Sequence, residues 1–277
     1  MLKDIFSRCK GWLCFAYAFL AVEFTIFAFM PYVLGKAIDA LIERDRSVLW
    51  IYVAVMSVGL AISYARRRID SRIFMNIWRQ KAVESIRDLI DRNVEPAKII
   101  VRASNIRQCA NFFECFIPSA VSAVMSIIVG GAMCCSALAW WASGTVLGLA
   151  AFSLSVSYFF SKRNGRIESE CQAMQEERET RIVNKDYSQI DDCYGCLKKL
   201  YVKQSDLEAC GWGIVDLCII IAEVVTVISL VGAGSTPGTI MATLAYVYKV
   251  IGNAGFFVHF FNQAQQINVI TEFLAKD

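Results

Sequence analysis

Histidine, proline and charged residues are all scarce in this chain. Its 277 residues include one His and four Pro, and 19% of them are charged. One His cannot build a metal centre of several imidazoles, and it leaves no Ser/His/Asp set that could be assigned. With 16 Gly and four Pro, the sequence also contains no low-complexity or disordered tract. We therefore expect neither an enzyme nor a bound cofactor.

Apolar residues dominate instead, at 56% of the chain with a mean hydropathy of +0.46. This composition is too apolar for an ordinary soluble domain. A helix needs about 20 apolar residues to cross a bilayer. We expect an all-α, polytopic membrane protein, a single domain over residues 1–277 with six transmembrane helices. The six runs are Trp12–Leu34, Val48–Ala65, Phe112–Leu138, Thr145–Phe160, Trp212–Val231 and Thr239–Phe261.

The basic residues predict the orientation of these helices. Three of them precede the first run, ten lie between Arg66 and Arg102, and nine lie between Lys162 and Lys203. The opposite loops hold only Lys36, Arg44 and Arg46. Lys and Arg accumulate on the cytoplasmic side of a membrane, so we expect both termini inside, in a plasma (inner) membrane.

The connections on the two sides differ in length. The outer ones should be short, over Gly35–Ser47, Trp140–Gly144 and Gly232–Gly238. On the inner side the sequence stays compatible with helix far beyond the apolar runs, which predicts cytoplasmic extensions at 66–103 and 162–208. Helices two and four should then reach about 45 residues, or roughly 65 Å. We expect the extensions to end in breaks at RNVEPAK (92–98) and DDCYGC (191–196), with Pro96 and Gly195 as docking points for a partner.

Eleven Cys do not form a disulfide framework here, because most lie in apolar runs or on the side where thiols stay reduced. Cys193 and Cys196 form a lone C-x-x-C, which is a weak signal for metal. Two copies could build a Cys₄ zinc site across a dimer axis. The alternative is a helical tip that holds two Cys, and we predict no metal.

Two basic or amphipathic stretches border the membrane. The segment 1–11, with DIFSRCKGW (4–12), is expected to form a short interfacial helix. The run ARRRIDSR (65–72) is interpreted as a contact with the headgroups of anionic membrane lipids. Nucleic-acid binding would need a soluble basic face, so no nucleic-acid partner is expected.

Ionisable residues inside the apolar runs are the candidate functional residues, because a charge at the bilayer centre costs several kcal/mol. Counting along each run places Glu23, Glu223 and Lys249 at one depth, near the midplane. Asp216 lies seven residues from Glu223, on the same helix face.

Helix six adds three polar residues. Tyr246 and Asn253 flank Lys249 at helical spacing, and His259 lies ten residues beyond it. One interpretation is structural, with Glu223 and Lys249 as a buried ion pair that fixes the packing. The other is functional: one Lys cannot neutralise three acids, so a remaining carboxylate would exchange protons or face a substrate in a hydrated cavity. Glu114, near the start of helix three, is given no role.

Six helices with short outer loops and long cytoplasmic extensions resemble the transmembrane domain of ABC exporters. MPYVLGKAIDALI (30–42) is similar to the end of that family's first helix, and STPGTIMATLAYVYKVIGNAGFFVHFFNQAQQINVITEFLAKD (235–277) to its sixth. The resemblance implies a homodimer with helices swapped between protomers, around a cavity that opens alternately to either side. Nothing in the sequence reads G-x-x-x-x-G-K-S/T, so we expect no nucleotide-binding domain.

We therefore predict ATP-independent, proton-coupled transport of a small or amphipathic organic molecule or a peptide. Stand-alone peptide transporters of the SbmA/BacA-like type share this general plan. The alternative is the transmembrane subunit of an ABC transporter whose ATPase is a separate chain, docked on the tips. The long extensions favour this alternative, since a proton-driven carrier has no evident need for them. A third class is a membrane receptor or assembly partner that does not transport.

Overall fold

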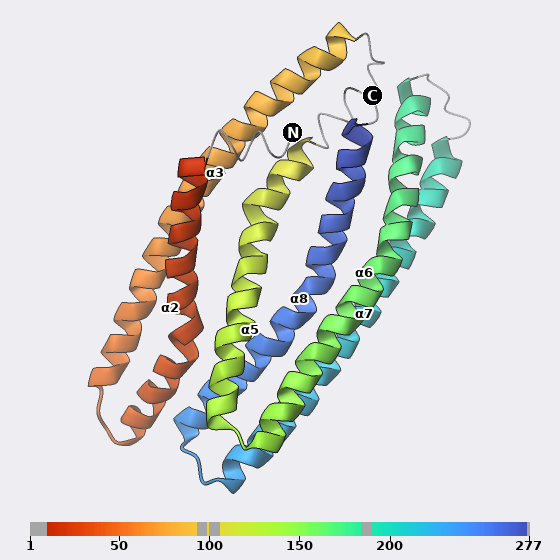
Figure 1. Ribbon diagram of the computed structural model, residues 1–277. Helices are drawn as coiled ribbons and strands as arrows, with labels where there is room; N and C mark the ends of the chain where they lie inside the picture. Colours follow the sequence, from red (N-terminus) through yellow and green to blue (C-terminus); the bar gives the residue numbers. More distant parts are fainter. Residues whose placement is uncertain (1–9, 93–98, 100–105, 184–189, 276–277) are drawn as a thin grey trace.

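Six long helices form the described part of the molecule, which is residues 10–92, 99, 106–183 and 190–275 of a computed structural model (Figure 1). All six are long and apolar enough to cross a membrane, which confirms the predicted fold class. A π-helical turn, η1 (Phe112–Phe116), leads into the third of them. The six are α2 (Lys10–Ile42), α3 (Ser47–Asp91), α5 (Ile117–Ala137), α6 (Trp140–Val183), α7 (Ile190–Gly232) and α8 (Pro237–Ala275).

Three of these helices have more than 40 residues, about twice what a bilayer requires. Helix α3 has 45 residues, α6 has 44 and α7 has 43. At 1.5 Å per residue, 45 residues span about 67 Å, roughly twice the thickness of the hydrocarbon core. The prediction of helices of about 45 residues is confirmed for the second and fourth spans.

The two ends of the molecule are therefore different. One end carries the tight connections α2–α3, α5–α6 and α7–α8, and we call it the short-loop end. The other, which we call the extended end, holds the far ends of α3, α6 and α7 together with the start of α2 and the end of α8 (Figure 1). Of the two predicted breaks, RNVEPAK falls largely outside the described residues, as do Pro96 and positions 1–9.

Three predicted connections are wrong because helices continue through them. DDCYGC, with Gly195, is not a break but forms the first turns of α7. Its two adjacent acidic residues suit a helix N-terminus, where a carboxylate interacts favourably with the helix dipole. Trp140–Gly144 begins α6, so this outer connection is shorter than expected. Helix α2 likewise runs through Gly35 to Ile42, eight residues past the predicted end.

Small buried side chains allow the helices to pack closely. Helix α8 contacts α2, α5, α6 and α7, while α3 packs mainly on α2. The main core lies where α5, α6, α7 and α8 meet, and its residues include Cys134, Val146, Ala222, Val247 and Ile251. Membrane helices have no hydrophobic drive to associate, so close contact between small residues is what holds them together.

The outer surface of the apolar runs carries many exposed large hydrophobic side chains, as a bilayer-spanning protein requires. Trp140 is 87% exposed and Trp50 is 70% exposed, and both lie near the short-loop end. Tryptophan is enriched at the membrane–water interface, which indicates where the bilayer boundary falls on that side.

Candidate functional site

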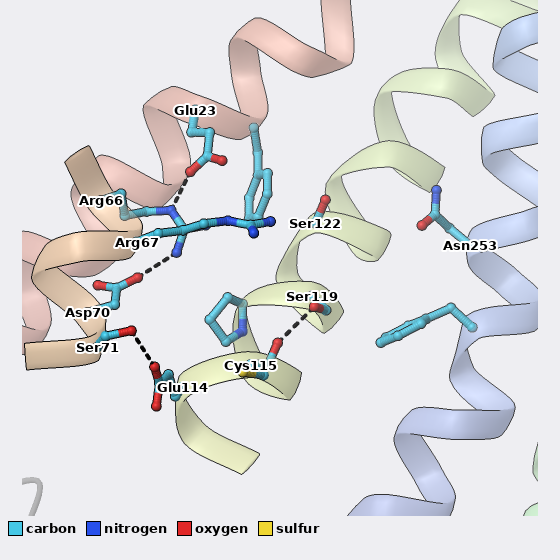
Figure 2. Close-up of a pocket in the computed structure, with 13 residues that line it drawn as sticks. Glu23, Arg66, Arg67, Asp70, Ser71, Glu114, Cys115, Ser119, Ser122 and Asn253 are labelled. Atoms are coloured by element: carbon cyan, nitrogen blue, oxygen red, sulfur yellow. Dashed lines mark hydrogen bonds and ion pairs between the residues drawn. The ribbon is translucent and has the colours of Figure 1, made fainter. Parts of the chain in front are cut away.

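A cavity of about 570 Å³ lies between α2, α3, η1, α5 and α8 (Figure 2). Pockets of roughly 300–1,000 Å³ are typical of small-molecule sites. Its wall combines acidic, basic and hydroxyl side chains with two aromatic rings. The lining residues are Glu23, Phe24, Arg66, Arg67, Asp70, Ser71, Glu114, Cys115, Pro118, Ser119, Ser122, Asn253 and Phe256.

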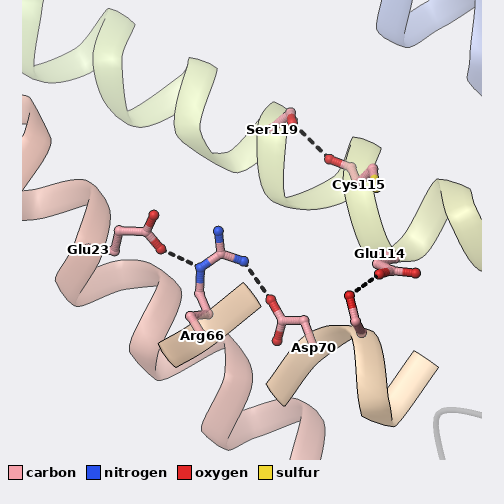
Figure 3. Close-up of polar contacts among 7 residues, drawn as sticks. Glu23, Arg66, Asp70, Glu114, Cys115 and Ser119 are labelled. Atoms are coloured by element: carbon pink, nitrogen blue, oxygen red, sulfur yellow. Dashed lines mark hydrogen bonds and ion pairs between the residues drawn. The ribbon is translucent and has the colours of Figure 1, made fainter. Parts of the chain in front are cut away.

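A buried charged triad forms one wall of the cavity (Figure 3). Arg66 donates one hydrogen bond from Nε to Glu23 on α2 and another from Nη1 to Oδ2 of Asp70, at 2.5 Å. The three residues are only 4% (Glu23), 7% (Arg66) and 6% (Asp70) exposed. Arg66 and Asp70 are four residues apart and so share one face of α3.

The triad carries an excess of negative charge. Two carboxylates share one guanidinium, and Oδ1 of Asp70 is buried without a hydrogen-bond partner among the described residues. A fork of N–H donors can hold two carboxylates in place, but it neutralises only one of them. The wall can therefore accept a proton or a positively charged group.

The π-helical turn η1 places a third carboxylate in the cavity. Ile117 N–H bonds to the carbonyl of Phe112, five residues back, and the next residue is Pro118, which has no N–H to give to Glu114. Phe112 stacks on Phe260 of α8 and anchors the turn. Glu114 then accepts a hydrogen bond from the hydroxyl of Ser71, at 2.6 Å (Figure 2).

Helix α5 and helix α8 supply the opposite walls. Ser119 and Ser122 lie on α5, and Asn253 and Phe256 lie on α8 (Figure 2). The amide of Asn253 donates to the carbonyl of Lys249, at 2.7 Å, which fixes its orientation. These residues offer hydrogen bonds and apolar contact without adding charge.

Lys249 lies one helical turn from Asn253 on α8, toward the short-loop end, and joins α8 to α2 there. Its Nζ donates to the backbone carbonyl of Phe27, at 2.8 Å. In a regular helix this carbonyl would accept from residue 31, which here is Pro31 and has no N–H. The lysine therefore satisfies a backbone acceptor that the sequence of α2 leaves free.

A second link between these helices closes the short-loop end. Asp39 on α2 accepts hydrogen bonds from the amide of Gly238, at 2.8 Å, and from the hydroxyl of Thr236, at 2.7 Å. Because these groups begin α8, the carboxylate caps its N-terminus. Gly35 and Gly238 are in backbone contact: a Cβ on Gly238 would come within 2.0 Å of the Gly35 carbonyl oxygen.

Two of the predicted site residues, Glu23 and Asn253, do line this cavity, but the predicted midplane cluster is not formed. Lys249 and Glu23 are separated by about one helical turn, because α2 extends past Leu34 and its centre moves accordingly. Among the described residues Glu223 makes no ion pair with Lys249 or any other basic group. On α7, Asp216 is exposed and Glu223 is half-buried.

The other predicted residues occupy different places. Tyr246 is buried and lines a smaller cavity of about 240 Å³ beside Asp39 and Gly238. The side chain of His259 lies outside the described residues. Cys193 is buried and Cys196 is exposed, and the described residues contain no group of three or more His, Cys, Asp and Glu that could hold a metal.

Sequence reasoning missed Arg66, Asp70, Ser71 and Glu114. The run 65–72 was interpreted as a lipid contact, yet Arg66 is buried and paired with Glu23. The spacing of Arg66 and Asp70, four residues apart on one helix face, was an available signal for an ion pair within the run. Pro118 inside an apolar run was another, since it disturbs the helix beside Glu114.

Comparison with known proteins fits this architecture. A search of the curated proteins finds no match to the chain. The family model of the ABC transporter transmembrane region matches residues 2–237, which is most of the sequence. Six membrane-spanning helices with a cavity among them agree with that match, and the chain belongs to the family of ABC transporter transmembrane regions.

Proposed function

We propose that this chain is the translocating body of a membrane transporter, and that its substrate passes through the cavity beside Glu23, Arg66 and Asp70. Family membership supports transport as the general function. The size of the cavity and its mixture of charged, hydroxyl and aromatic groups suit a small or amphipathic organic molecule or a peptide.

Alternating access follows from the way α2 and α8 are joined. They are linked at Asp39 and at Lys249, and they diverge toward the extended end, beside the cavity (Figure 1). This is the arrangement of a conformation closed at the short-loop end. The basic residues of the extensions favour a cytoplasmic location for the extended end. Both termini then lie on the cytoplasmic side of the plasma (inner) membrane. A homodimer would place the exposed face of α7, which includes Asp216, at the interface between protomers or at the lipid.

The negative excess of the triad supports proton coupling, and this is the observation that carries the proposal. Glu23 and Asp70 share one guanidinium in a buried site, so one of the two negative charges is left uncompensated and protonation of one carboxylate is favoured. Asp70 can take up a proton when the cavity faces one side and release it when the hydration and charge around it change. Transport then draws on a proton gradient and needs no ATP.

The test uses purified protein in vesicles filled with DNA, which trap the amphipathic probe ethidium. Uptake is followed by fluorescence, without ATP and with a pH gradient imposed in either direction. Asp70→Asn and Glu23→Gln should abolish the dependence on the gradient, while Asp206→Asn, an exposed control on α7, should not. Unchanged, gradient-dependent uptake in both cavity variants would remove proton coupling through the triad.

A second candidate keeps ATP as the energy source. Its supporting observation is the length of α3, α6 and α7, which reach well beyond the bilayer at the extended end. Such helices could dock an ATPase supplied by a separate chain. Co-purification of a stoichiometric ATPase, with ethidium uptake that requires ATP, would establish this candidate; uptake driven by the pH gradient alone would exclude the need for it.

A further inference from the structure

We infer that the cavity binds an amphipathic organic cation, with its positive charge beside Glu114 and Asp70 and its apolar part against Phe24 and Phe256. The inference rests on the proposed function and adds to it the chemical class of the substrate. It also assigns Glu114 a binding role that the sequence did not indicate.

The charges of the lining favour a cation. Three carboxylates face the cavity, from Glu23, Asp70 and Glu114, against the two guanidinium groups of Arg66 and Arg67. Arg66 donates hydrogen bonds to both Glu23 and Asp70. Asp70 is 6% exposed, and its buried Oδ1 has no partner among the described residues. A buried acceptor with no donor is costly, and a positive group in the cavity offsets that cost.

Glu114 is the carboxylate that a ligand can reach. One of its oxygens accepts the Ser71 hydroxyl, and within the described part of the chain no basic residue pairs with it. The π-helical turn that presents it is a rare feature that often marks functional sites. Here the turn has a local cause in Pro118 and a structural support in the stacking of Phe112 on Phe260.

Of the two cationic residues that line the cavity, Arg66 is held by two carboxylates and Arg67 opposes a bound cation, but its position limits that effect. It reaches from α3 into the cavity (Figure 2), but it is exposed, so its charge is screened by water and salt. The carboxylates of Glu23 and Asp70 are buried and are screened much less. Removing the charge of Arg67 should therefore strengthen the binding of a cation.

The aromatic groups complete the site. Phe24 on α2 and Phe256 on α8 line the cavity from opposite helices and are both partly buried. An aromatic face attracts a nearby cation and also offers apolar area to an organic body. An inorganic cation would gain nothing from the apolar area of these rings.

The chain contains its own reporter for this site. Cys115 is exposed and lines the cavity, whereas Cys196 is exposed on α7 and lies outside the lining. The experiment measures alkylation of both thiols by N-ethylmaleimide, by peptide mass spectrometry of the protein in nanodiscs. The probes are tetraphenylphosphonium and tetraphenylborate, which have the same shape and opposite charge.

Tetraphenylphosphonium should slow the alkylation of Cys115 and leave that of Cys196 unchanged, and tetraphenylborate should leave the alkylation of both thiols unchanged. Glu114→Gln should weaken this protection about tenfold, as expected for a lost charge partner at the cavity wall. Arg67→Gln should strengthen the protection of Cys115 by tetraphenylphosphonium. Glu114 bonds only to Ser71 in the described structure, so its Gln variant should fold. An unchanged melting temperature and an unchanged rate of Cys196 alkylation check that it does.

Equal protection by the two probes, or protection by the borate alone, would overturn the inference, as would full protection in Glu114→Gln. These results are independent of ethidium uptake. Uptake without charge-selective protection would leave transport standing and reject the cation site. Charge-selective protection in a protein that moves nothing would retain the site and reject transport.

Discussion

The link between Lys249 and the Phe27 carbonyl can be tested by a double-mutant cycle with Pro31. In the structure the lysine supplies the donor that Pro31 withholds from this carbonyl. Lys249→Met removes the donor from α8. Pro31→Ala restores an amide on α2, four residues from Phe27, so the same carbonyl regains a partner within its own helix.

The magnitude follows from the kind of bond. A hydrogen bond from a charged donor contributes about 1.5–3 kcal/mol, and an unsatisfied carbonyl inside a membrane is costly. We expect Lys249→Met to lower the free energy of unfolding by about 2 kcal/mol, a fall in melting temperature of about 4–8 °C. In the Pro31→Ala background the same change should cost at least about 1 kcal/mol less.

Thermal unfolding of the four proteins in one detergent, followed by tryptophan fluorescence, measures the cycle. Lys203→Met, at an exposed position on α7, controls for the loss of a lysine as such. Additive effects of Lys249→Met and Pro31→Ala would refute the reasoning, because they would mean that the two residues do not share the Phe27 carbonyl.

Three further predictions concern the elements that shape the cavity and close it. Asp39→Ala should destabilise the protein by about 1–2 kcal/mol, because the Gly238 amide and the Thr236 hydroxyl at the start of α8 lose their acceptor; its melting temperature measures this against Glu43→Ala, at an exposed position in the neighbouring loop. Gly238→Ala should cost about 1–3 kcal/mol, because its Cβ would lie 2.0 Å from the Gly35 carbonyl oxygen, and an unchanged melting temperature would contradict this contact. Pro118→Ala should let the π-helical turn relax to α-helix and withdraw Glu114, which weakens the protection of Cys115 by tetraphenylphosphonium; undiminished protection would show that the turn does not position the carboxylate.

Much of the fold could be predicted because each of its causes is local. Apolar runs gave the six spans, and the absence of Gly and Pro over long stretches gave the 45 residues of α3. The errors lie at helix ends. Trp140–Gly144 and DDCYGC contain residues that often form turns, but tertiary packing continues the helices through them.

The site was harder to predict because it depends on rotation and register between helices. Counting places Glu23 at the midplane only if α2 ends at Leu34, and the helix continues to Ile42. This shift moves Glu23 toward the extended end, level with Arg66 on the antiparallel α3. Burial of one arginine among three consecutive ones is likewise a property of helix orientation, which no single-sequence pattern specifies.

The links between α2 and α8 form a series along one seam. The first link is Asp39 with Gly238. The second, Phe27 with Lys249, lies about 16–18 Å from the first along the axes of both helices. Glu23 and Asn253, which line the cavity, lie about 6 Å beyond the second link. The first two links satisfy backbone groups that would otherwise be free, at a helix start and opposite a proline. Opening the cavity toward the short-loop end requires breaking both, so the sequence of α2 itself stabilises the closed side. A transporter that alternates must recover that free energy from its substrate, from protons or from a partner, and the negative cavity directly below the seam is where binding of a positive charge could act on it.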